Sequence, residues 1–279
     1  MKKLFSRAVV YLGVLTVLDF SLYAGVPFNN LEGVGGAAFN PFAYTAGNDF
    51  EKDDTQPQKK SLADIFSKPQ IGTWYVHLGD VGIDWTTIGV AGTLFKRLEV
   101  SYGYESISVA NAKNIYKNNF GLKYLIVKET DVIPAISFGT VFKHTSFSTP
   151  PGVDKSGVDF YLVATKFIKA LPVPVLLSGG FLSTKGQTLG VLGFNNDRDE
   201  VFFGNIDIMP FENIAVGFEY RQGAKYKTWK DADYWNTHLA WFVNKNLTLI
   251  AAYVNTGNHR SSSKVGLGGG VVVSLQYAF

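Results

Sequence analysis

The 279-residue sequence contains no cysteine and has only two methionines and four histidines. The absence of cysteine excludes disulfide bonds, thiolate metal ligands and a cysteine nucleophile. Only a few histidines are available as metal ligands, namely His77, His144, His238 and His259. We therefore predict neither a metal ion nor a cofactor.

Charge is also scarce, because only 18% of the residues are charged and the net charge is +3. Residues 1–24 carry three basic residues against one acid, so their removal lowers the net charge to +1. This balance gives no electrostatic basis for binding nucleic acid, and we predict no nucleic-acid partner. The content of 46% hydrophobic and 15% aromatic residues excludes intrinsic disorder.

The sequence lacks an uninterrupted apolar run of the roughly 20 residues that a membrane-spanning helix needs. Its main apolar run, residues 8–18, follows Lys2, Lys3 and Arg7 and precedes the small residue Ala24. This order predicts a secretory signal peptide over residues 1–24. Any residence in a membrane must then depend on strands.

Residues 25–68 differ in composition from the rest of the chain, with a glycine-rich stretch at 33–36 and a charged run at 51–60. We predict that they form an N-terminal segment that lies in the periplasm or inside a barrel as a plug. Within this segment, residues 61–66 either form a short helix capped by Ser61 or continue a solvated linker.

Residues 69–279 are predicted to form strands. Apolar and polar residues alternate there within segments of about ten residues, and turn residues separate the segments. Twelve such segments can be counted, at residues 70–79, 84–94, 97–106, 114–127, 132–144, 157–169, 173–184, 200–210, 213–222, 232–243, 246–256 and 267–279. Their connections alternate between short turns such as 95–96 and long polar loops such as 145–156, 185–199, 223–231 and 257–266. This pattern is typical of bacterial outer-membrane barrels.

The predicted fold class is therefore all-β, a transmembrane antiparallel up-and-down β-barrel of about twelve strands. An even number places both ends of the barrel on the periplasmic, short-turn side. The main alternative has fourteen strands, with two of them drawn from residues 33–46. A soluble β-sandwich would also alternate, but its apolar face would not end in aromatic residues at both extremes.

The apolar face of each segment is predicted to meet lipid, with aromatic rings at the two membrane interfaces. The interface residues are Tyr104, Tyr116, Tyr220, Trp235, Trp241 and Tyr253. The chain ends on a strand that carries Leu275, Tyr277 and Phe279 on one face. This ending resembles the terminal signal that the barrel-assembly machinery recognises in outer-membrane proteins.

Several motifs resemble those of a proteobacterial family described only as a domain of unknown function. They are Leu31 to Gly36, Phe39 to Ala43, Ala46–Gly47 and Arg97 to Tyr102. Members of that family look like secreted outer-membrane barrels, and the resemblance would cover most of the mature chain. It brings no catalytic or ligand-binding residues. The chain departs from the family pattern at Phe42, where tryptophan is expected, and in the charged run at 51–60.

Charged and polar residues on the opposite strand faces are predicted to line the lumen. Neighbouring antiparallel strands should bring some of them together, and the candidates are Glu99, Lys117, Lys123, Asp207, Glu219, Arg221 and His238. They could form a constriction that selects small polar or charged solutes. Alternatively, they could form a salt-bridged network that fills a narrow lumen.

The predicted function is a passive, porin-like channel for small solutes in the bacterial outer membrane, in a monomeric or weakly oligomeric protein. Its expected partners are outer-membrane lipid, lipopolysaccharide, the barrel-assembly machinery and the solutes themselves. We predict no enzymatic activity and no catalytic residue. The alternatives are a structural or adhesive barrel without a pore, or a lipid hydrolase at the rim that uses His144 with Ser146 or His259 with Ser261.

Overall fold

The computed structural model describes residues 28–47, 65–110 and 112–279. The predicted signal peptide lies outside these residues, as does most of the predicted helical turn at 61–66. In the part of the chain that is described, no helix has the length and apolar character needed to cross a membrane.

The described residues fold almost entirely into strands. Two short strands, β1 (Phe28–Asn29) and β2 (Gly35–Gly36), pair with each other near the N-terminus. The remaining strands are β3 (Gln70–Leu78), β4 (Ile83–Leu94), β5 (Leu98–Val109), β6 (Ile115–Val127), β7 (Ala135–Thr145), β8 (Ser156–Ile168), β9 (Val175–Gly186), β10 (Phe194–Phe211), β11 (Ile214–Arg221), β12 (Tyr234–Phe242), β13 (Leu247–Asn255) and β14 (Gly269–Ala278). A 3-10 turn, η2 (Gln187–Gly190), connects β9 to β10.

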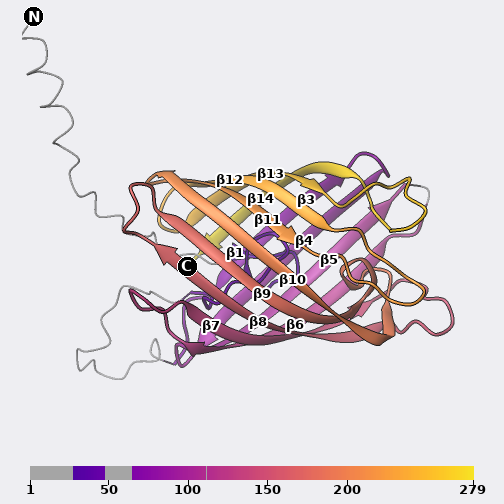
Figure 1. Ribbon diagram of the computed structural model, residues 1–279, viewed down its shortest axis with the longest axis horizontal. Helices are drawn as coiled ribbons and strands as arrows, with labels where there is room; N and C mark the ends of the chain where they lie inside the picture. The colour runs from indigo at the N-terminus through magenta and orange to yellow at the C-terminus, as the bar shows by residue number, and fades with distance from the viewer. Residues whose placement is uncertain (1–27, 48–64, 111) are drawn as a thin grey trace, which may run out of the picture.

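Strands β3 to β14 form one closed antiparallel barrel (Figure 1). Each strand pairs with its neighbour in sequence, and β14 closes the ring on β3, with Ala278 opposite Gln70. The predicted fold is thus confirmed with twelve strands. The alternative of fourteen is wrong, because β1 and β2 pair with each other and not with the wall.

The strand boundaries agree with the predicted segments to within a few residues, except at β10. That strand begins at Phe194 instead of residue 200, so the predicted loop 185–199 shrinks to residues 187–193. Phe194 pairs with Gly186 and also bridges to Asp154, and its side chain is fully buried. The burial of this ring extends the sheet beyond the point where the apolar alternation becomes visible in the sequence.

The outer face of the barrel is apolar on every strand from β3 to β14. On β6, for example, Phe120, Leu122 and Tyr124 are about half exposed, while Asn119 and Lys123, at alternate positions of the same strand, are buried in the lumen. A closed sheet pairs all its backbone groups, so this apolar exterior suits a barrel in lipid.

The aromatic residues predicted for the membrane interfaces all lie on the outer face. Near the long loops, Tyr104 stacks on Tyr116 with ring centroids 6.2 Å apart, and Trp235 lies 6.0 Å from Tyr253. Tyr220 lies opposite Trp235 in the same band, and Trp241 is exposed near the short turns. Leu275, Tyr277 and Phe279 also point outward. Their roles at the interface and in assembly stay predictions.

The lumen has two chemically different walls. The inner faces of β5 to β8 form the polar wall, with the buried residues Glu99, Glu105, Lys117, Asn119, Lys123, Lys143, Asp159 and Thr165. The inner faces of β12 to β14 and β3 form what we call the apolar wall, with Trp74, Val76, Leu78, Ala240, Phe242, Ile250, Val254 and Val272. Its buried polar residues are mostly uncharged, namely Gln70, Asn236, Thr248, Ser274 and Gln276. The sequence analysis predicted a mixed polar lining and did not predict this division.

Candidate functional site

Residues 28–47, here called the inner segment, lie inside the barrel (Figure 1). Both ends lie at the rim that carries the short turns. At the start, the ring of Phe28 stacks on Phe242 at the end of β12, with centroids 6.0 Å apart. At the end, the carbonyl of Ala46 accepts hydrogen bonds from Thr93 and Ser67. The segment therefore enters and leaves the lumen from the same side.

A tight turn reverses the inner segment deep in the lumen. The side chain of Asn30 accepts hydrogen bonds from the backbone N–H groups of Glu32 and Val34, at 2.9 and 3.0 Å. Gly33 has a φ of +83° and lies directly against β5, where an added Cβ would come within 2.4 Å of the Tyr102 carbonyl oxygen. Only glycine combines this backbone conformation with such a close approach.

Glu32 at this turn joins two ion pairs of the polar wall into one ladder. Lys117 Nζ lies 2.8 Å from Glu105 Oε1 and 3.1 Å from Glu32 Oε1. Lys143 Nζ contacts the same Glu32 oxygen and lies 2.6 Å from Asp159 Oδ2. Acid and base thus alternate across β5, β6, the inner segment, β7 and β8, and all five side chains are less than one-tenth exposed.

Glu99 on β5 holds the inner segment at a second place. One carboxylate oxygen accepts the N–H of Gly35 at 2.9 Å, and the other accepts the N–H of Ala46 at 2.8 Å. Lys123 Nζ lies 2.9 Å from Glu99 and donates to the Gly35 carbonyl at 2.8 Å. The pair therefore adds side-chain partners to the backbone of the segment, where the Gly35 carbonyl also accepts the N–H of Phe42 at 3.1 Å.

Glu219 on β11 holds the segment at a third place, on the side away from the ladder. Its carboxylate accepts the consecutive N–H groups of Ala38, Phe39 and Asn40 at 3.1, 3.0 and 2.7 Å. The side-chain amide of Asn236 donates to the same carboxylate. A carboxylate in a concave set of backbone donors is a strong, charge-assisted contact.

The structure brings the predicted lumen residues together in two groups. Glu99, Lys117, Lys123 and Glu219 contact the inner segment directly, and Arg221 donates to the Phe39 carbonyl at 3.4 Å. Asp207 and His238 instead pair with each other at 2.6 Å, and the second ring nitrogen of His238 lies 2.8 Å from Asn236 Oδ1. Whether any of these residues forms a constriction stays a prediction.

The sequence analysis missed the contributions of Glu32 and Asp159 to the ladder. Asp159 could have been found, because it occupies an inward position in the alternating segment 157–169. Glu32 carries no such signal, because the glycine-rich stretch around it has no periodicity. The contact between Tyr44 and Glu129 was also missed: the Tyr44 hydroxyl donates to Glu129, which lies in the turn between β6 and β7.

At the opposite rim, the turn at residues 187–193 folds inward and is held by Asp231 from the loop between β11 and β12. Thr188 and Leu189 have positive φ angles of 48° and 60°, a strained conformation for residues with side chains. The Asp231 carboxylate accepts the N–H of Thr188 at 3.0 Å and the indole N–H of Trp229 at 2.7 Å. Burial raises the pKa of Asp231 to about 6, although these donors and Arg221 lower it.

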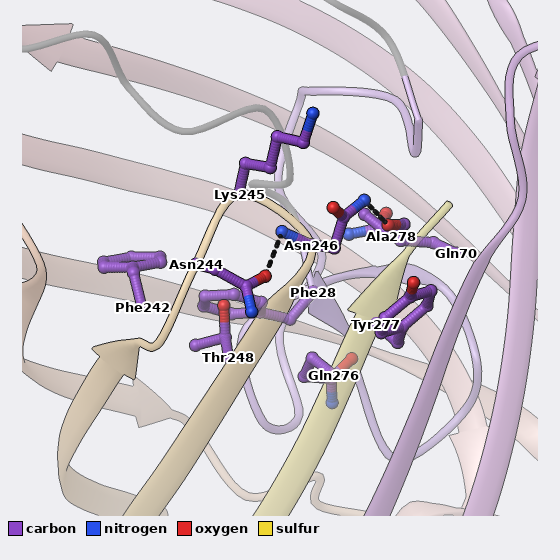
Figure 2. A pocket seen from close by; sticks show the side chains of 10 residues that line it. All are labelled: Phe28, Gln70, Phe242, Asn244, Lys245, Asn246, Thr248, Gln276, Tyr277 and Ala278. Atoms are coloured by element: carbon purple, nitrogen blue, oxygen red, sulfur yellow. Dashed lines mark hydrogen bonds between the residues drawn. The ribbon is translucent and has the colours of Figure 1, made fainter.

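Among the described residues, three small hollows lie between the inner segment and the barrel wall. The first, the rim pocket, lies next to the turn between β12 and β13 (Figure 2). Cavity A lies beside β10 to β13. Cavity B lies toward the long loops beside β3, β13 and β14.

The histidine–serine pairs considered in the sequence do not form. His144 Nδ1 lies 2.8 Å from Ser156 Oγ, whereas Ser146 Oγ accepts the backbone N–H of Tyr116. His259 accepts a hydrogen bond from Arg260, and Ser261 contacts Ser263. In the described ranges, no group of three or more His, Asp or Glu side chains is placed to hold a metal ion.

The family model for DUF3034, a protein family of unknown function, matches residues 25–266. The chain belongs to this family. The resemblance seen in the sequence is thereby confirmed, and its motifs meet in the structure: Gly35 and Ala46 of the inner segment both bind Glu99 in the motif that begins at Arg97. No curated protein matches the sequence.

Among solved structures, the chain is similar to outer-membrane barrels. The KdgM porin is 14% identical, with 75% of this chain and 99% of that chain covered and a TM-score of 0.52. The KdgM porin in complex with disordered oligogalacturonate is 15% identical over the same shares, with a TM-score of 0.51. The NanC porin is 8% identical over 76% and 98% of the two chains, with a TM-score of 0.48. The likeness to KdgM is one of fold.

Proposed function

We propose that this protein is a porin-like channel of the bacterial outer membrane whose lumen is closed by its own N-terminal segment. The observation that carries the proposal is the way the inner segment is held. Glu32, Glu99 and Glu219 anchor it through hydrogen bonds and ion pairs, and both of its ends lie at one rim. Departure of the segment would exchange these polar contacts for water and expose buried apolar side chains such as Leu31, Val34 and Phe42, but it would leave the pairing of the barrel strands intact.

The location follows from the barrel itself. Its apolar exterior and aromatic bands fit the outer membrane, which the protein would reach through a signal peptide and the barrel-assembly machinery. There it would contact lipid and lipopolysaccharide and pass small solutes. We propose no enzymatic role, because neither His144 nor His259 is paired with the serine that the hydrolase alternative requires. An adhesive role has no specific observation in its favour.

The first test is the conductance of the folded barrel in planar bilayers, with and without residues 28–47. We expect brief or small currents from the full chain and a larger steady current from the shortened one. Equal currents would contradict a role of the segment in closure. The absence of current from both proteins would contradict the channel function.

A second test locks the segment in place with a disulfide bond. Because the sequence contains no cysteine, an introduced pair of cysteines can bond only to each other within the chain. The Ser137 hydroxyl donates to the Ala43 carbonyl, so a disulfide between Ala43→Cys and Ser137→Cys would tie the segment to β7. We expect oxidation to hold the channel closed and reduction to restore openings. Each single variant serves as the control, and mass spectrometry verifies the bond. Openings that persist with the bond intact would contradict closure by this segment.

A further inference from the structure

The three hollows are consecutive along the apolar wall. The rim pocket and cavity A share Phe28 and Phe242. Cavity A and cavity B share Ala38 and Asn236. Together they extend from the short-turn rim, shown in Figure 2, to the turn at residues 187–193 near the other rim. The inner segment thus fills the polar side of the lumen and leaves unfilled space along the apolar side.

The walls of cavities A and B are almost entirely carbon. Cavity A is bordered by Phe42, Trp74, Ala215, Ala240 and Ile250, among others. Most of its polar atoms are already engaged, because His238 bonds to Asp207 and to Asn236, and Asn236 donates to Glu219. Asp207 Oδ2 is the exception, since it is buried without a hydrogen-bond partner. A solute in this space would find few groups free to replace its hydration.

Cavity B has a mainly apolar wall, with Leu31, Val76, Leu78, Val254 and Val272. Two of its other residues, Trp85 and Tyr234, carry a buried Nε1 and a buried hydroxyl without a hydrogen-bond partner. Moving a hydroxyl or amide from water into such surroundings without a hydrogen-bond partner costs a few kcal/mol, and moving an ion costs far more. Burying apolar surface is instead favourable, by about 25 cal/mol per Å². The route therefore favours apolar solutes over sugars or ions.

Three narrow contacts close the route. The stacked rings of Phe28 and Phe242, 6.0 Å apart, separate the rim pocket from cavity A. The backbone at Ala38, held by Glu219, meets Asn236 between the two cavities. Leu189 and Leu267 end cavity B beneath the long loops. Two of these contacts include residues of the inner segment, so its displacement would open both.

We propose that cavities A and B form a closed route for small apolar molecules, such as aromatic or aliphatic hydrocarbons, along the apolar wall. The route meets the short-turn rim at the rim pocket, whose lining is mainly polar. The proposal rests on the channel function above and names its class of solute. The polar wall and Glu219 then anchor the inner segment beyond Asn29, and the apolar wall holds Asn29 through Trp74 and Gln276 and offers its remaining surface to the solute. Ions and sugars would pass only when the whole segment leaves the lumen.

The test compares two solutes in intact Gram-negative cells that produce the protein. N-phenyl-1-naphthylamine is an apolar probe that becomes fluorescent in apolar surroundings, and nitrocefin is a polar anion whose entry is read by a periplasmic β-lactamase. We expect the wild-type protein to accelerate entry of the apolar probe over cells without the protein, with little change for nitrocefin. Phe28→Ala, which removes one ring of the first closure, should raise probe entry several-fold.

Ala240→Phe, which fills cavity A from β12, should return probe entry toward the background of cells without the protein. Ala251→Phe is the matched control, because Ala251 lies on the lipid-facing side of β13, and it should behave as the wild type. Heat-modifiable mobility on gels verifies that each variant is folded. Should Ala240→Phe not fold, Ala252→Phe fills the same cavity from β13.

The outcomes separate the two proposals. Faster nitrocefin entry without faster probe entry would overturn the apolar route and leave the channel standing. Unchanged entry of both solutes, even after removal of residues 28–47, would overturn the channel itself. A direct measurement supports or overturns the route independently: crystals under xenon should show the gas in cavities A and B, because dry apolar cavities bind it. Empty cavities would contradict the apolar assignment.

Discussion

The polar and the apolar wall of the lumen face the same inner segment but hold it in different ways. The polar wall meets the segment with carboxylates and lysines whose partners are specific atoms, such as the N–H of Gly35 on Glu99. The apolar wall meets it with carbon and with a few neutral hydrogen bonds, those of Trp74 and Gln276 with the backbone of Asn29, and leaves cavities A and B. The comparison teaches that charged contacts gather on one side of the lumen and unfilled space on the other.

The largest expected effect comes from breaking the ladder on the polar wall. Lys117→Met removes the partner of Glu105 and one partner of Glu32, both buried. Leaving a buried charge without its partner should lower the free energy of unfolding by about 3–5 kcal/mol. Urea unfolding in lipid vesicles, followed by tryptophan fluorescence, measures the change.

Lys155→Met, in an exposed loop position, is the control for the loss of a lysine and should have little effect. Adding Glu105→Gln to Lys117→Met should recover part of the lost stability, because one unpaired charge is then removed. If Lys117→Met were as mild as Lys155→Met, the ladder would not be the specific anchor described here.

Truncation of the apolar wall should cost less and should leave the segment in place. Ile250 is 6% exposed and borders cavity A. Ile250→Ala should lower the free energy of unfolding by about 2 kcal/mol, the low end for such truncations, because the side chain already adjoins unfilled space. Hydrogen exchange at the amides of residues 38–40 should stay as slow as in the wild type. Faster exchange there would show that the two walls are not independent.

Removal of the third anchor should have the opposite pattern, with a local effect on the segment. Glu219→Ala takes the acceptor from three consecutive backbone N–H groups. The contact at residues 38–40 should weaken by about 1–3 kcal/mol, the cost of leaving a buried donor unsatisfied. Faster hydrogen exchange at these amides and more frequent channel openings would be observed. Glu212→Ala, in an exposed turn, should change neither quantity.

The smallest effect concerns the turn that covers cavity B. Burial raises the pKa of Asp231 from 3.8 to about 6, so the folded turn favours the protonated carboxyl. The stability that Asp231 contributes to the folded turn through this pKa shift is therefore fully present below pH 3.8 and is lost as the pH rises through about 6. After correction for the intrinsic exchange rate at each pH, the hydrogen exchange of the Thr188 amide should be faster at pH 7 than at pH 5. The increase should be at most roughly tenfold per pH unit.

Asp231→Asn carries no titratable group at this position and should flatten this pH dependence. Asp197→Asn, which changes an exposed acid with a side chain 64% accessible, should leave it as in the wild type. A pH profile that is the same for Asp231→Asn and the wild type would assign the effect to another group.

The sequence by itself determined the barrel. The alternation of apolar and polar residues is a local property with a period of two, so segments such as 97–106 reveal a strand, its two faces and its turns without reference to the rest of the chain. The same pattern placed Glu99, Lys117 and Glu219 in the lumen and Tyr116 and Trp241 on the lipid side. The number of strands followed from these local signals.

Only the tertiary structure decided where residues 28–47 lie and what the lumen contains. The segment has no periodicity, and its backbone donors are satisfied by side chains as distant in sequence as Glu99 and Glu219. The division of the lumen into two walls is equally non-local, because it arises when β14 closes on β3 and brings Val272 beside Val76. A local pattern can define a strand and its faces, but a contact between distant segments exists only once the chain has closed on itself.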